Sequence, residues 1–240
     1  MWWEIKLNSK KLRQIIDEEL RMLNEGYLLH DLRAVTLGRA YMYLGEYEKG
    51  KEYILKCIEE EIKFEKKVME EYGYESEQVA MCKVRIGKHM RWIGEIEKME
   101  EKFKEAIEIF NKVYEEGKRE KLKLVLYPWG SSDFYKLWAT AEFYLGNYEK
   151  AVEIEKLMEG RHGILPRGFA ESILKRDVEG IKTLIKRLVE LIKDEKRPLH
   201  SNVYNHDPWH WYEEGKKLIG LPSIFDVYDK REPMFECNRE

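Results

Sequence analysis

A cluster of histidine and aromatic residues at positions 200–213 holds the side chains whose types and spacing could do chemistry. His206 and His210 are four residues apart, a spacing that can chelate Zn²⁺ from one face of a helix. Asp207 followed by Pro208 is, however, typical of a helix N-cap with proline in the first turn, which places His206 outside the helix that holds His210. No glutamate follows His206, so the H-E-x-x-H pattern of metalloproteases is absent. We expect a capped helix start with aromatic packing, and a partner-binding patch or a metal site remains an alternative.

Other chemistry-bearing residues match structural roles better than catalytic ones. Glu159 and His162 have the E-x-x-H spacing of di-iron bundles, but glycines flank them and no second copy exists. The three cysteines form no C-x-x-C pair and no disulfide framework. Ser or Thr never follows a glycine-lysine pair, which excludes a Walker A loop. The sequence therefore predicts no catalytic residues, no metal ligands and no cofactor, and hence a protein that is not an enzyme.

Composition and charge point to a folded protein with a mixed-charge surface. Hydrophobic residues make up 43% of the 240 residues, charged residues 37%, and the formal net charge is −3. Such a surface exerts no long-range attraction on nucleic acid or anionic membranes. The chain has no long apolar run for a signal peptide or a membrane span, so we expect a cytoplasmic protein. Abundant Lys, Glu and Arg with few glutamines suggest a thermophilic source.

Helical periodicity runs along almost the whole chain. Apolar residues recur at spacings of three and four in about ten segments, which predicts an all-α fold of stacked antiparallel helical hairpins. The segment from Leu122 to Tyr127 alternates like a strand but has no second run to pair with. We interpret it as a helix end or an extended linker. The sequence predicts one helical-repeat domain over residues 1–240, with a sub-boundary near 121–131.

An internal repeat is visible at an offset of 101 residues. Residues 43–53 and 144–154 share Tyr-Leu-Gly, an aromatic residue after the turn, and Glu-Lys. Gly45 and Gly146 follow amphipathic segments, where a helix commonly ends in a left-handed residue. The repeat predicts Tyr47 and Tyr148 as largely buried wedges, and small residues three positions on let the helices approach closely. A looser third copy is assigned to residues 101–110, with Phe103 at the position of Tyr47.

These turns resemble the tetratricopeptide repeat family. The family's hairpin turn has glycine, an acidic residue or Asn, an aromatic residue, and a small residue three positions on, as in residues 45–50 and 146–151. The aromatic positions are separated by 56 and 45 residues, whereas the family period is about 34. The resemblance implies a degenerate helical-repeat scaffold that binds another protein.

The last 75 residues carry a second resemblance. A helix through Leu191, an irregular linker, a helix through Ile219 and an acidic-aromatic tail form a layout similar to toxin-immunity proteins of the immunity protein 49 type. That resemblance implies binding to a toxin. The toxin-neutralising function and an enzyme or metal-binding protein using the 200–210 histidines are the alternatives to the scaffold.

Aromatic residues beside two irregular segments are the candidate partner contacts. Tryptophan and tyrosine are the usual anchors of protein interfaces, and we expect at least two residues of the set Trp129, Trp209, His210 and Trp211 to line a surface cleft. A second copy of the chain is a further candidate partner, through Trp2 and Trp3. The predicted partner-binding residues are Trp129, Tyr204, His206, Trp209, His210 and Trp211.

Overall fold

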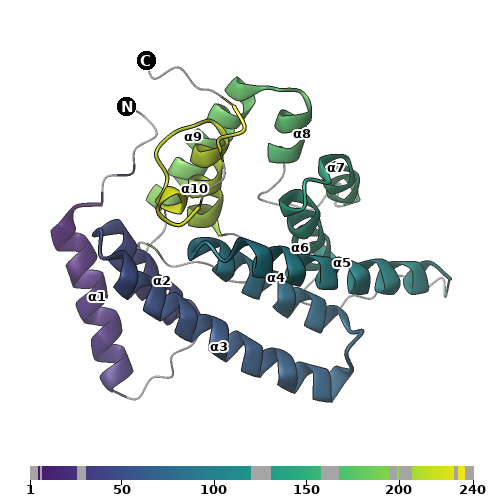
Figure 1. The fold of residues 1–240 in the computed structure, drawn as a ribbon, viewed down its shortest axis with the longest axis horizontal. Coiled ribbons are helices and arrows are strands. Elements are labelled where there is room, and N and C mark those ends of the chain that lie inside the picture. The colour runs from purple at the N-terminus through teal and green to yellow at the C-terminus, as the bar shows by residue number, and fades with distance from the viewer. Residues whose placement is uncertain are drawn as a thin grey trace. The chain divides into compact units, whose positions relative to one another are not determined.

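The protein is helical throughout the part of the chain that the structure describes. This computed structural model describes residues 5, 7–25, 31–119, 131–157, 168–194, 199, 207–229 and 232–235. These residues form ten α-helices, one 3₁₀ helix and no strand, so the all-α prediction is confirmed (Figure 1). The elements are α1 (Ser9–Asn24), α2 (Asp31–Tyr43), α3 (Tyr47–Tyr72), α4 (Glu77–Trp92), α5 (Ile96–Arg119), α6 (Ser131–Tyr144), α7 (Tyr148–Lys156), α8 (Phe169–Leu174), α9 (Val178–Asp194), α10 (Pro208–Leu218) and η1 (Ile224–Val227). The segment at 122–127, interpreted as a helix end or an extended linker, lies outside the described residues.

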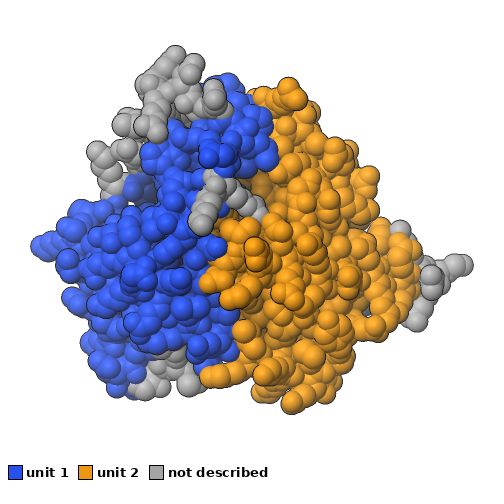
Figure 2. Space-filling model, viewed as in Figure 1, with its two compact units in different colours: residues 1–60, 92–94, 178–240 blue, residues 61–91, 95–177 orange. Residues whose placement is uncertain are grey.

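The chain divides into two compact units, coloured separately in Figure 2. The first unit comprises Met1–Glu60, Trp92–Gly94 and Val178–Glu240, and the second comprises Glu61–Arg91 and Glu95–Asp177. The divisions therefore lie elsewhere than the sub-boundary predicted near 121–131. That sub-boundary and the single domain over 1–240 stay predictions.

In the first unit α1 packs on α2, and α10 packs on α9 and η1. The side chain of Asn8 caps α1 by accepting from the Lys11 amide at 2.7 Å. Helices α2 and α3 touch through two glycines: a Cβ on Gly50 would lie 2.6 Å from Met42 Cγ, and one on Gly38 would lie 2.7 Å from Ile54 Cδ1. The close approach predicted at Gly50 is thus confirmed.

In the second unit α5, α6, α7 and α8 pack in sequence, each on the next. Aromatic rings fill this core, for example Phe110 against Trp138 with centroids 6.1 Å apart. The buried Lys83 of α4 joins two other helices, pairing with Glu65 of α3 at 2.7 Å and with Glu105 of α5. Burial opposes the charge of Lys83, but the bonds to Glu105 and Glu65 prevail and raise its pKa. The network thus specifies how three helices dock.

The same turn joins α2 to α3 and α6 to α7. The Glu46 amide donates to the Tyr41 carbonyl at 2.9 Å, and the Asn147 amide donates to the Glu142 carbonyl at 2.9 Å. Between these residues Gly45 and Gly146 adopt φ of 81° and 79°. Such a six-to-one bond with a left-handed residue is the Schellman motif. The helix-ending role predicted for both glycines is therefore confirmed.

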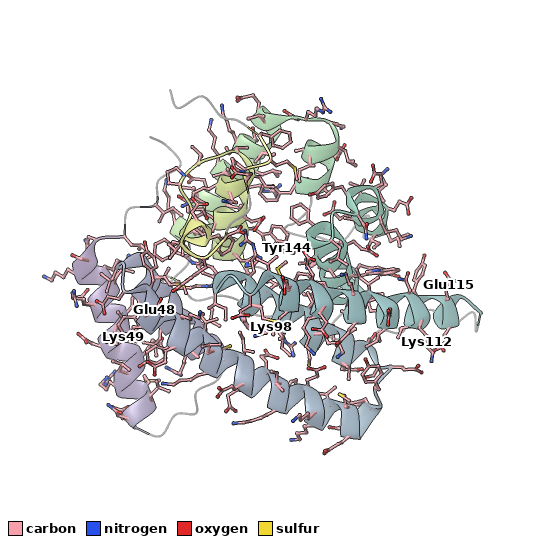
Figure 3. All side chains as sticks on the ribbon, viewed as in Figure 1. Glu48, Lys49, Lys98, Lys112, Glu115 and Tyr144 are labelled. Atoms are coloured by element: carbon pink, nitrogen blue, oxygen red, sulfur yellow. The ribbon has the colours of Figure 1, made fainter. Side chains whose placement is uncertain are left out.

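Two further copies of this turn join α4 to α5 and α8 to α9. Gly94 has φ 72° and the Glu95 amide donates to Met90 at 3.1 Å, while Arg176 has φ 53° and the Asp177 amide donates to Ser172 at 2.8 Å. The third copy predicted at residues 101–110 is therefore wrong: that segment lies inside α5, and the true copy is Gly-Glu-Ile-Glu-Lys at 94–98, against Gly-Glu-Tyr-Glu-Lys at 45–49. Figure 3 labels Lys49 and Lys98, which hold the same place in the first turns of α3 and α5.

The tyrosines after the turns are less buried than predicted. Tyr47 and Tyr148 are both half-buried. The ring of Tyr148 packs edge-on against Phe143 at 5.6 Å, and that of Tyr47 packs against Tyr228 at 6.5 Å. Tyr47 and Tyr148 are the first residues of α3 and α7, and in the first of these hairpins the close contact between helices is made by Gly50, three positions after Tyr47.

Candidate functional site

The two ends of the 200–206 segment are attached to neighbouring positions on α2 in the first unit. On one side the Leu199 carbonyl accepts a hydrogen bond from the Thr36 hydroxyl at 3.5 Å. On the other side the Asp207 carboxylate accepts from the Arg39 guanidinium at 2.6 Å. Positions i and i+3 lie on one face of a helix, so Thr36 and Arg39 hold both ends within one turn of α2.

Leu199 adopts an unfavourable backbone conformation to do this. Its φ is 65°, in the left-handed region, and its side chain is fully buried. A left-handed conformation costs a non-glycine residue about 1–2 kcal/mol. Strain of this kind persists where the surrounding structure imposes it, and it concentrates at functional sites. The burial of Leu199 and its bond to Thr36 supply that constraint here.

Asp207 fixes the other end through two separate bonds. One carboxylate oxygen accepts a hydrogen bond from the buried Arg39 guanidinium. The other accepts from the His210 amide at 3.0 Å, which makes Asp207 the N-cap of α10. The predicted cap at Asp207 with Pro208 in the first turn is thus confirmed. Removing one partner of a buried ion pair typically costs about 3–5 kcal/mol, so this attachment is strong.

The side chains that follow on α10 point into the core of the first unit. Trp209, His210 and Trp211 are 0%, 0% and 3% exposed. The Trp209 ring packs edge-on against Tyr43 at 5.4 Å, and His210 lies against Phe225 at 5.5 Å. The prediction that they line a surface cleft is therefore wrong. The reason is physical: α10 lies against both α9 and η1, and its Trp209 and His210 rings pack on Tyr43 of α2 and on Phe225 of η1.

A buried glutamate on α10 completes the network. Glu213 accepts from the Tyr43 hydroxyl at 2.6 Å, the Ser223 hydroxyl at 3.0 Å, the Ile224 amide at 2.9 Å and Lys216 at 2.8 Å. Four donors occupy both carboxylate oxygens, which leaves this group no free capacity to act as a general base. Ser223 is also committed to capping η1. The network is architectural and joins α10 and η1 to α2.

The remaining predicted site residues cannot be placed. Trp129, Tyr204 and His206 lie outside the described residues, and a role for them stays a prediction. Within the described ranges no group of three His, Cys, Asp or Glu side chains could hold a metal ion. Among the same residues, no helix combines the length and apolar character needed to cross a membrane.

The residues that build the base of this site were not recognised in the sequence. Arg39 is the one charge between Ala34 and Leu44. Charged side chains are almost never fully buried unless paired, so a lone arginine in an apolar helix was the available signal. Its partner Asp207 is 168 residues away, and sequence spacing alone does not identify it.

Comparison with known proteins supports the hairpin assignment. Residues 34–61 match a family model described as tetratricopeptide repeat, which spans α2, the Gly45 turn and the first part of α3. No curated protein and no solved structure matches the chain. With this match over the α2–α3 hairpin and one helix-ending turn at four connections between the described α-helices, the chain is a tetratricopeptide-like, all-α helical protein.

Proposed function

We propose that the chain is a non-enzymatic helical-repeat scaffold that binds another protein. The repeated turn is the observation that carries this proposal, because helical-repeat proteins build extended binding surfaces from stacked hairpins. The match to the tetratricopeptide repeat over residues 34–61 supports it. The saturated Glu213 network supports it further, since its polar groups serve helix packing.

The partner contact that we propose is the 200–206 segment, through Tyr204 and His206. Binding residues commonly lie on loops that a rigid scaffold positions. Here the strained Leu199 and the buried Asp207 attach both ends to α2. Holding the ends reduces the entropy that binding would otherwise have to remove. Trp209, His210 and Trp211 contribute by anchoring α10 in the core of the first unit.

Site-specific photo-crosslinking tests this function. Benzoylphenylalanine replaces Tyr204 in one variant and Trp129 in a second, and the chain is irradiated in a lysate of its source. The control variant carries the crosslinker at Tyr74, a tyrosine that is 50% exposed in the second unit. We expect Tyr204 to capture one defined protein that Tyr74 does not capture. The same mixture of proteins at all three positions, or none at Tyr204, contradicts the proposal.

A second variant separates binding from folding. Thr36→Val removes the hydroxyl that bonds Leu199 and keeps the side-chain shape. Thr140→Val is the matched control, because Thr140 is also buried and its hydroxyl bonds a backbone carbonyl, that of Lys136 at 2.7 Å. Thr36→Val should weaken affinity for the captured protein, and Thr140→Val should not. If the purified chain instead holds stoichiometric metal that His206→Ala removes, the enzyme alternative is the better one.

A further inference from the structure

The chain itself shows how one hairpin turn of this protein is covered. In the first unit the Tyr228 hydroxyl donates to the carbonyl of Tyr47, the first residue of α3, at 2.7 Å. The Cβ and carbonyl oxygen of Tyr228 rest on Gly94, where an added Cβ would lie 2.5 and 2.7 Å from them. The ammonium of Lys51 lies 5.5 Å from the Tyr228 ring. A turn glycine and a helix-start carbonyl from the preceding hairpin therefore hold one tyrosine.

The second unit repeats the two elements of this arrangement. Gly146 is the next left-handed turn glycine after Gly94, with φ of 79° against 72°. Ile96, the first residue of α5, occupies the place that Tyr47 has in α3. Helix α5 packs on α6. The corresponding pair before it, α3 and α4, is joined by the Glu65–Lys83 ion pair. Gly146 itself is exposed, and an added Cβ there would meet no atom of the described residues within 4 Å.

We propose that the Gly146 turn and the Ile96 carbonyl form a docking surface for a protein segment that presents a tyrosine, in the way that residues 223–229 present Tyr228. The tyrosine backbone would rest on Gly146, which has no side chain to prevent the approach, and its hydroxyl would donate to Ile96. Capping by Ser223 and Asp226 gives the 223–229 segment local structure of its own. The partner is therefore expected to carry a similarly short, capped turn before the tyrosine. This surface goes beyond the 200–206 contact and does not depend on it.

The test uses a fluorescein-labelled peptide of residues 223–229 with the purified full-length chain, followed by fluorescence anisotropy. Asparagine tolerates the left-handed region, so Gly146→Asn fills the proposed surface with little backbone strain. Gly45→Asn is the matched control, because Gly45 has φ 81° and, among the described residues, equally open surroundings with no tyrosine on it. Circular dichroism confirms that both variants are folded.

We expect saturable binding to the wild-type chain and to Gly45→Asn, and binding to Gly146→Asn that is weaker by about tenfold or more. A peptide with Tyr228→Phe should bind about 2- to 10-fold more weakly, the loss that one hydrogen bond represents. No saturable binding, an equal effect of both asparagines, or equal binding of the phenylalanine peptide overturns the proposal. The assay contains no cellular partner, so its failure leaves the crosslinking result at Tyr204 untouched.

Discussion

Replacing Tyr43 with phenylalanine tests whether the Glu213 network holds α10 to α2. The change removes a hydroxyl bonded to a carboxylate at 2.6 Å and keeps the ring that packs against Trp209. Hydrogen bonds to charged groups contribute about 1.5–3 kcal/mol. Glu213 retains three other donors after the change, so we expect the lower end, a loss of about 1.5–2 kcal/mol in the free energy of unfolding.

Urea unfolding at pH 7, followed by tryptophan fluorescence and circular dichroism, measures this loss. Tyr74→Phe is the control, because Tyr74 is 50% exposed and a surface change of this kind stays within about 0.5 kcal/mol. A change below about 0.5 kcal/mol for Tyr43→Phe would refute the argument, because the bond would then contribute no more than a surface contact.

The same variant makes a prediction about alkaline pH. Desolvation, and next the nearby Glu213 carboxylate, raise the pKa of Tyr43 well above its ordinary value. The unfolded chain therefore loses this proton first, near pH 10. The stability from Tyr43 is fully present below about pH 10 and declines as pH rises toward the folded-state pKa. The difference in the free energy of unfolding between wild type and Tyr43→Phe should narrow above about pH 10. A difference that stays constant up to about pH 11 would contradict the raised pKa of Tyr43.

Four further predictions concern the hairpins and the second unit. Arg176→Gly should raise stability by about 0.5–1 kcal/mol, because glycine adopts the φ of 53° without strain; a loss in thermal unfolding would show that Arg176 makes a compensating contact. Gly50→Ala should cost about 1–3 kcal/mol in urea unfolding, since the new methyl would overlap Met42, and a gain would mean that α2 and α3 lie farther apart. Glu65→Ala should cost about 3 kcal/mol by breaking the buried pair with Lys83. Burial opposes the charge of Glu105, but its bonds to Lys83 prevail and lower its pKa. The stability that this carboxylate contributes is therefore present above about pH 4.5 and is lost as pH falls further. If the free energy of unfolding of the wild type and of Glu105→Gln fell identically with acid, this contribution would be excluded.

The turns show how far sequence reasoning reaches in this fold. Gly45 and Gly146 were recognisable because glycine, tyrosine and a small residue stand at fixed offsets. The copy at Gly94 has Gly-Glu and Glu-Lys but holds Ile96 in place of the aromatic residue, so the aromatic pattern indicates Phe103 instead. The copy at Arg176 lost its glycine altogether. Its left-handed conformation is imposed by the helices on either side.

The site was harder to predict than the fold, for a physical reason. Trp209 and Trp211 have the side chains of interface anchors, but the same rings also fill cores. Which role applies depends on whether other elements cover them, and here both rings are buried, with Trp209 against Tyr43 of α2. The Asp207–Pro208 cap was predictable because capping is local to a few residues. The Arg39–Asp207 pair was not, because it joins residues 168 positions apart.

Amide hydrogen exchange at the turns tests the central claim, that the same helix-ending turn forms four connections between the described α-helices. The amides of Glu46, Glu95, Asn147 and Asp177 each donate to a carbonyl five residues earlier at 2.8–3.1 Å. Exchange followed by nuclear magnetic resonance should therefore find all four protected, although each lies just past a helix end. Protection at Glu46 and Asn147 alone would reduce the repeat to the two copies visible in the sequence. Fast exchange at all four would contradict the tetratricopeptide-like account.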